Sequence, residues 1–155
     1  MEGNSNVYEK IEADIKHAFK TGDALRRSVL VMLKAAVANK AIEKRERDGK
    51  PSNDMVLDIA TVEAKRRRDT IAQYETAGRA DLAEKEKQEL AIIMEFLPRQ
   101  LSEEEITALV NQAVSETKAQ GEKDFGKVMG ALASKIKGRA DGAVVSKIVK
   151  VKLLG

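Results

Sequence analysis

The chain has 155 residues, of which 43% are hydrophobic and 34% are charged, and its formal net charge is +3. This length supports one substantial hydrophobic core or two small ones. The absence of Cys excludes disulfides, thiolate metal sites and a cysteine nucleophile. Only two prolines occur, and residues that favour helices dominate, so we expect an all-α fold.

The sequence gives no sign of a targeting or membrane segment. The first six residues, M-E-G-N-S-N, contain no apolar signal core, and no stretch approaches eighteen apolar residues. We therefore expect a cytoplasmic protein with no membrane partner.

An apolar stripe predicts the first helix, over 6–21. Its members recur every four residues, which places them on one helical face: Val7, Ile11, Ile15 and Phe19. Gly22 follows in the position that favours the end of a helix, and Asp23 can cap a second helix. The second helix is expected to end near Arg47, because residues 48–53 are all typical of turns.

Two longer amphipathic segments follow, over 54–76 and 80–96. The first has apolar positions at Met55, Ile59, Val62, Ile71 and Tyr74. Residues 77–79 separate the two segments, and Pro98 closes the second. So short a break between two long helices predicts an antiparallel helical hairpin.

The best domain boundary lies around Pro98. Residues 1–98 are expected to form an N-terminal helical subdomain, and 99–155 an unlike subdomain made of three short helices. Ser102 and Glu105 have the spacing of a capping box and begin the first of these helices. A second helix is expected over about 124–137, and Asp141 can cap the third.

The C-terminal end of the chain carries a concentration of positive charge. Residues 121–155 contain eight Lys or Arg and three Asp or Glu, so the remainder of the chain is slightly acidic. This asymmetry indicates a negatively charged partner. Candidate contacts are the basic residues Lys127, Lys135, Lys137, Arg139, Lys147 and Lys150; the alternative is a generic charged surface.

Four ordered motifs resemble the YqeY-like family. They read A-G-R-A-D-L-A-E-K-E (77–86), F-L-P-R-Q-L-S-E-E-E (96–105), F-G-K-V-M-G (125–130) and K-G-R-A-D-G (137–142). This family is similar to the tail domain of the B subunit of the tRNA-dependent Asp/Glu amidotransferase. The resemblance implies an all-α protein of two subdomains whose tail contacts tRNA. It also carries a carbon–nitrogen ligase label with glutamine as amide donor.

The residues themselves predict no catalytic centre. The chain has neither a phosphate-binding loop motif nor a strand to carry one, and it lacks a glutamine-hydrolysing arrangement. His17 stands alone beside Asp14, and no metal-ligand spacing accompanies it. We therefore expect no cofactor and no metal. The leading hypothesis is a tRNA- or RNA-binding accessory protein; the alternatives are an adaptor that docks a partner helix and a ligase accessory.

Two features have competing interpretations. The basic block 65–68 spreads around a helix, so ion pairs with Glu84, Glu86 and Glu89 are favoured over RNA contact. Gly126 and Gly130 lie one turn apart on one helical face. We expect at least one of them to allow close helix packing, while the other could offer a smooth surface to RNA or to a partner helix.

The turn before Asp141 is expected to bind phosphate through side chains. Free N–H groups at a helix N-terminus can bind an anion. The Asp141 carboxylate would occupy those groups, however, and repel the anion. A single aromatic residue, Phe125, leaves no platform for stacking unpaired bases, so contact should be with the backbone and shape of a folded RNA.

Overall fold

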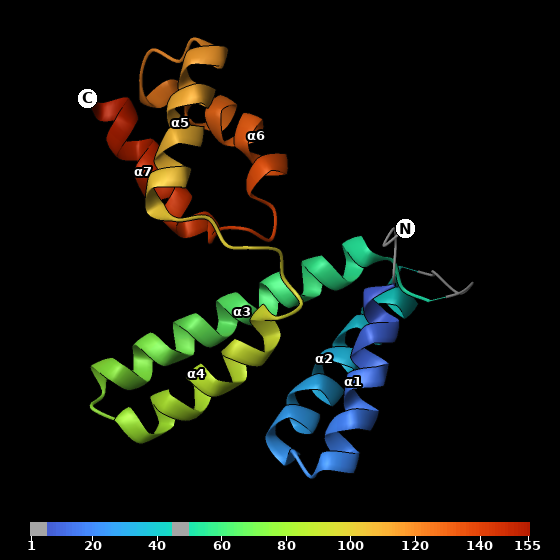
Figure 1. The fold of residues 1–155 in the computed structure, drawn as a ribbon. Helices are drawn as coiled ribbons and strands as arrows, with labels where there is room; N and C mark the ends of the chain where they lie inside the picture. Colours follow the sequence, from blue (N-terminus) through green and yellow to red (C-terminus); the bar gives the residue numbers. More distant parts are fainter. Residues whose placement is uncertain (1–5, 45–49) are drawn as a thin grey trace. The chain divides into compact units, whose positions relative to one another are not determined.

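The structure, a computed structural model, describes residues 6–44 and 50–155. Within these residues there are seven α-helices, one short 3-10 helix and no strand, which confirms the all-α fold (Figure 1). The elements are α1 (Val7–Thr21), α2 (Ala24–Glu43), α3 (Asn53–Thr76), α4 (Ala80–Met94), α5 (Glu103–Thr117), η1 (Glu122–Asp124), α6 (Phe125–Ile136) and α7 (Gly142–Leu154).

The chain divides into two compact units, Met1–Leu97 and Pro98–Gly155, each with its own buried core. In the first unit α1 lies beside α2, and α3 pairs with α4 as the predicted helical hairpin (Figure 1). The core of this unit contains Ile11, Leu30, Leu33 and Ile93, all fully buried. We call the two parts the N-terminal and C-terminal units.

Side-chain caps fix several helix ends where the sequence predicts them. Asp23 accepts a hydrogen bond from the backbone N–H of Arg26 and so caps α2. Gly22 ends α1 with φ of +75°, a conformation that favours glycine. The predicted end of the second helix near Arg47 lies outside the described residues.

Two apolar side chains lie outside the core into which the stripes place them. Phe19 is 66% exposed, and the guanidinium of Arg27 lies 4.7 Å from the centre of its ring. Val62 on α3 is 54% exposed. The apolar spacing predicts which face of a helix these residues share, but it does not show which members of that face are covered by a neighbouring helix.

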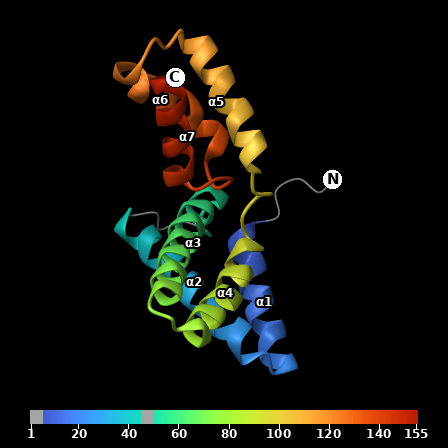
Figure 2. The same ribbon diagram turned by 90° about the vertical axis from the view of Figure 1, so that its left-hand side faces the viewer.

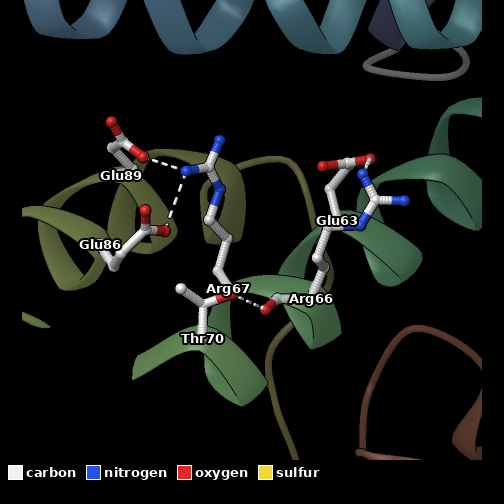
Figure 3. A network of polar contacts seen from close by, with 6 residues as sticks. All are labelled: Glu63, Arg66, Arg67, Thr70, Glu86 and Glu89. Carbon is white, nitrogen blue, oxygen red and sulfur yellow. Dashed lines mark hydrogen bonds and ion pairs between the residues drawn. The ribbon is translucent and has the colours of Figure 1, made fainter. Parts of the chain in front are cut away.

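The hairpin of α3 and α4 is joined by an ion-pair network (Figure 3). Arg67 on α3 contacts the carboxylates of Glu86, at 3.0 Å, and Glu89 on α4. These three side chains are largely withdrawn from solvent. Arg66 instead pairs with Glu63 one turn earlier on its own helix, at 3.2 Å.

The interpretation of the block 65–68 as a structural feature is therefore confirmed in part. Arg67 forms the predicted pairs across the hairpin, but the expectation that Arg66 does so was wrong. The physical reason is direction: adjacent residues on a helix point about 100° apart. Arg67 and Arg68 both reach α4, where Arg68 contacts the sulfur of Met94 at 3.4 Å, whereas Arg66 points away from that helix. Lys65 also pairs within its own helix, with Asp69 at 3.3 Å.

The C-terminal unit is a bundle of α5, α6 and α7 (Figure 2). Its core combines Val110 and Ala113 from α5 with Leu132 from α6 and Val145 and Val149 from α7, all fully buried. The short helix η1 precedes α6. No feature of the sequence predicted η1. The three helices of this unit thus bury their apolar faces against one another.

We predict that residues 98–155 fold without the rest of the chain. The reason is that their apolar core is formed by their own three helices. Far-ultraviolet circular dichroism of this fragment should show a helical spectrum and a cooperative thermal transition. An unfolded spectrum at low temperature would contradict the independence of the two units.

We predict that Arg67→Met destabilises the N-terminal unit by about 2–4 kcal/mol, because it leaves two half-buried carboxylates without their cation. The matched control is Lys65→Met, which removes an exposed pair with Asp69 within α3 and should cost less than about 0.5 kcal/mol. Urea denaturation followed by circular dichroism measures both. Equal losses in the two variants would show that burial of the network contributes nothing.

Candidate nucleic-acid interface

The segment before α5 is bound to the turn between α6 and α7. The backbone N–H of Leu101 donates to the carbonyl of Arg139 at 2.8 Å, and the side-chain amide of Gln100 donates to the carbonyl of Gly138 at 2.8 Å. The Nε of Arg139 donates to the carbonyl of Arg99 at 3.4 Å. Gly138 has φ of +71°, which other residues rarely adopt. The motifs at 96–105 and 137–142, which lie far apart in the sequence, therefore form one local structure.

This structure holds a second arginine close to the turn. Arg99 pairs with Glu105 at 3.0 Å, while Glu105 and Ser102 form the predicted capping box of α5. The pKa of Glu105 lies below its ordinary value, chiefly because Arg99 donates a hydrogen bond to it and also because the Ser102 N–H does. The charge of Arg139 acts on Glu105 in the same direction. The carboxylate thus stays ionised beside two guanidinium groups.

Arg99 belongs to this surface although the pattern of charge along the sequence does not predict it. It precedes the charge-rich end of the chain by more than twenty residues, so a count of charges over 121–155 does not reach it. The available signal was the F-L-P-R-Q-L motif, whose arginine lies shortly before the capping box. We call Arg99, Lys137 and Arg139 the turn cations.

Asp141 caps α7, as predicted. Its Oδ1 atom accepts a hydrogen bond from the backbone N–H of Ala143 at 2.9 Å. The carboxylate therefore occupies a donor that an anion would need, and its charge opposes an anion at that position. Any phosphate near this turn would be held by the side chains of Lys137, which is exposed, and Arg139, which is half-buried.

The six predicted basic residues do not gather on one surface. Lys127 is exposed on α6, and Lys137 directly follows that helix. Lys135 is directed to α5, where it pairs with Glu116 at 3.8 Å. On α7, the ammonium of Lys150 lies 5.6 Å from the centre of the Phe125 ring, and Lys147 lines a groove between α5 and α7.

The outer face of α6 is formed by small residues. Gly126 and Gly130 are both exposed, and a Cβ atom added at either would meet no neighbour within 4 Å. The expectation that one of them allows close helix packing was therefore wrong. Ala133 and Ser134 continue the same exposed face. Lys127 and Lys137 stand along a surface that is smooth and uncharged between them.

Other candidate chemistry is sparse in the described part of the chain. No three His, Asp or Glu side chains there come together as metal ligands. His17 is exposed, and Asp14 beside it pairs with Arg26 at 3.0 Å. None of the described helices combines the length and apolarity that crossing a membrane requires.

Comparison with known proteins finds fungal relatives. A protein of Pyrenophora tritici-repentis named "Altered inheritance of mitochondria protein 41, mitochondrial" is 28% identical over 150 residues, covering 93% of this chain and 79% of the relative. The protein of that name from Candida glabrata is 29% identical over 93 residues, which are 60% of this chain. The match spans half of the Candida protein's length.

A shorter match joins the chain to an archaeal protein. A component of the glutamyl-tRNA(Gln) amidotransferase of Aeropyrum pernix is 44% identical over 59 residues, which are 36% of this chain and 9% of that protein. The higher identity is thus confined to a small part of a much larger protein.

The family model described as "Yqey-like protein" matches residues 8–153, almost the whole chain. It includes all four motifs that carry the resemblance, and it spans both structural units. The chain therefore belongs to the YqeY-like protein family.

Proposed function

We propose that the C-terminal unit binds the phosphate backbone of a folded RNA, with tRNA as the expected ligand. The observation that carries the proposal is the fixed cluster of turn cations. Three hydrogen bonds hold the two segments that bear Arg99, Lys137 and Arg139 together. Fixing the backbone that carries these cations reduces the conformational entropy that binding would otherwise cost.

The α6 face extends this surface. Its glycines, Gly126 and Gly130, leave room for a nucleic-acid backbone to approach the helix closely, and Lys127 and Lys137 flank the approach. Lys135 and Lys150 are not part of the proposed interface, because Lys135 is directed toward Glu116 on α5 and Lys150 lies over the Phe125 ring. The proposed interface therefore comprises the turn cations, Lys127 and the two glycines.

The mode of recognition follows from the shortage of aromatic side chains. Phe125 is the single aromatic residue of 98–155, and Lys150 lies over its ring. Such a surface cannot stack a series of unpaired bases. It suits the phosphates and the shape of a structured RNA, such as the folded body of a tRNA.

The choice of tRNA is supported by the archaeal relative, whose name places it in an amidotransferase of glutamyl-tRNA(Gln). Because the match covers 9% of that relative, its activity is not carried over to this chain. We propose that this protein is a non-enzymatic accessory. The carbon–nitrogen ligase activity that the family resemblance implies would then belong to a larger amidotransferase. Its cytoplasmic location stays a prediction, since the fungal relatives are named mitochondrial.

We predict a salt-dependent affinity for tRNA that depends on the turn cations. Each cation that neutralises a phosphate releases counterions, so three or four contacts give a slope of log affinity against log salt of roughly −2 to −4. Lys137→Gln with Arg139→Gln should flatten the slope by about one to two units. Fluorescence anisotropy with labelled tRNA at several salt concentrations measures this.

The matched control removes two exposed charges elsewhere, as Lys65→Gln with Lys85→Gln in the N-terminal unit. It lowers the net charge by the same amount and should leave the slope within about half a unit of the parent. Circular dichroism verifies that helix content is unchanged in both variants. Identical binding by the parent and the turn variant across the salt range would remove the basis of the RNA proposal.

We also predict that the purified protein, given ATP, glutamine and misacylated tRNA, forms no amidated product. The chain carries no sequence motif for phosphorylating the ester or hydrolysing glutamine. Chromatography of the amino acids released from the tRNA measures the product. Turnover that co-purifies with the protein through successive columns, and is lost in the Lys137/Arg139 variant, would establish an enzyme instead.

A further inference from the structure

The C-terminal unit contains a groove between α5 and α7 whose lining includes none of the turn cations. The groove has a volume of about 490 Å³. Its α7 wall is formed by Val144, Ile148 and Val151, and the fully buried Val110 of α5 reaches its floor. Val144 and Val151 are 44% and 68% exposed. A hollow that is lined by exposed valines is a costly surface to leave in water.

Two valines and an isoleucine of the groove have the spacing of a helix contact. Positions 144, 148 and 151 recur at intervals of four and three residues, which defines one face of α7. A different face of the same helix, with Val145 and Val149, is fully buried in the core. The helix α7 is therefore apolar on two sides. On the second side Ile148 is partly buried against the core, while Val144 and Val151 are exposed. A seam two turns long, about 10 Å, matches a partner helix of three or more turns.

The charges around the groove specify the partner further. Lys147 and Lys152 stand at its α7 edge, and α7 contains no acidic residue. The α5 wall presents the uncharged Thr107 and Asn111, with Glu103 as the only acidic residue of the lining. The net charge of this lining is positive. Charge complementarity therefore favours a partner with carboxylates beside its apolar stripe.

We propose that this groove docks an amphipathic helix of another protein, with an apolar stripe and acidic residues on its flank. An RNA backbone fits the groove poorly, because phosphates gain nothing from burying valines and the lining contains no aromatic residue for a base. The docking site lies on α5 and α7, whereas the proposed RNA contacts lie on α6 and at the turn. The proposal therefore stands independently of RNA binding.

The test uses the full-length protein and two synthetic helices of about 18 residues. The first carries leucines along one face with glutamates on the flank, and the second has lysines in place of those glutamates. Fluorescence anisotropy should show that the glutamate helix binds at least tenfold more tightly than the lysine helix. Chemical shifts in ¹⁵N spectra should change at Thr107, Asn111 and Lys147.

Three variants assign the binding to the groove. Val151→Glu should weaken binding of the glutamate helix by about tenfold or more, because it places a charge in the apolar seam. Lys147→Glu with Lys152→Glu should reverse the preference toward the lysine helix. Val62→Glu on α3 alters another exposed valine outside the groove and should change nothing. Circular dichroism checks that each variant is folded.

Several outcomes would overturn the proposal. The glutamate helix could fail to bind, or could bind Val151→Glu as tightly as the parent. Sedimentation could show a dimer that Val151→Glu abolishes, which would make the occupant a second copy of the chain. Loss of tRNA affinity in Val151→Glu would identify the groove as an RNA surface instead. Unchanged tRNA binding with a lost peptide affinity is the result we expect.

Discussion

The arrangement of the C-terminal unit depends on the attachment of the segment before α5 to the turn between α6 and α7. Two hydrogen bonds of 2.8 Å, to the carbonyls of Arg139 and Gly138, bring together residues nearly forty positions apart. The same attachment lies next to the first residues of α5, which Ser102 and Glu105 cap, and next to the first residues of α7, which Asp141 caps. Without it, Arg99 and Arg139 would belong to separate surface loops. The cationic cluster is thus a consequence of the bundle's topology.

The two units use their charges in different ways. In the N-terminal unit, Arg67 is matched by carboxylates across the helical hairpin, and its charge is used for packing. In the C-terminal unit, the cations outnumber the acids, and the basic residues of α7 have no acidic neighbour on their own helix. A block of four basic residues can therefore be used largely within the fold, as Arg66 and Arg67 are. The number of basic residues in a short stretch therefore does not by itself indicate a binding surface; the acidic side chains packed against them must be counted as well.

Much of the fold could be predicted from the sequence because its local signals agree with one another. Caps at Asp23, Ser102 and Asp141, together with the apolar periodicity, define the helices before any tertiary contact is considered. What the sequence could not show depends on a neighbour in space. Phe19 lies on a correct stripe but beyond its packing partner, and the role of Gly126 and Gly130 depends on which helix faces them.

The candidate site was less accessible to prediction for the same reason. The sequence indicated the basic turn, yet it could not show that Lys135 turns to Glu116, that Lys150 covers a ring, or that Arg99 joins from another segment. The groove between α5 and α7 has no sequence signature that separates it from the core, because Val144 and Val145 are adjacent and chemically identical. Only packing decides which valine is buried and which is exposed.

The measurement that tests the central claim most directly is a titration of the ¹⁵N-labelled full-length protein with unlabelled tRNA at low and at moderate salt. Our account predicts shift changes that concentrate at residues 99–102, at residues 137–142 and along the outer face of α6, and that diminish as salt rises. Changes confined to the N-terminal unit, or to the groove between α5 and α7, would contradict it. So would changes at the turn that persist undiminished at high salt, because they would show that phosphate neutralisation is not the source of binding.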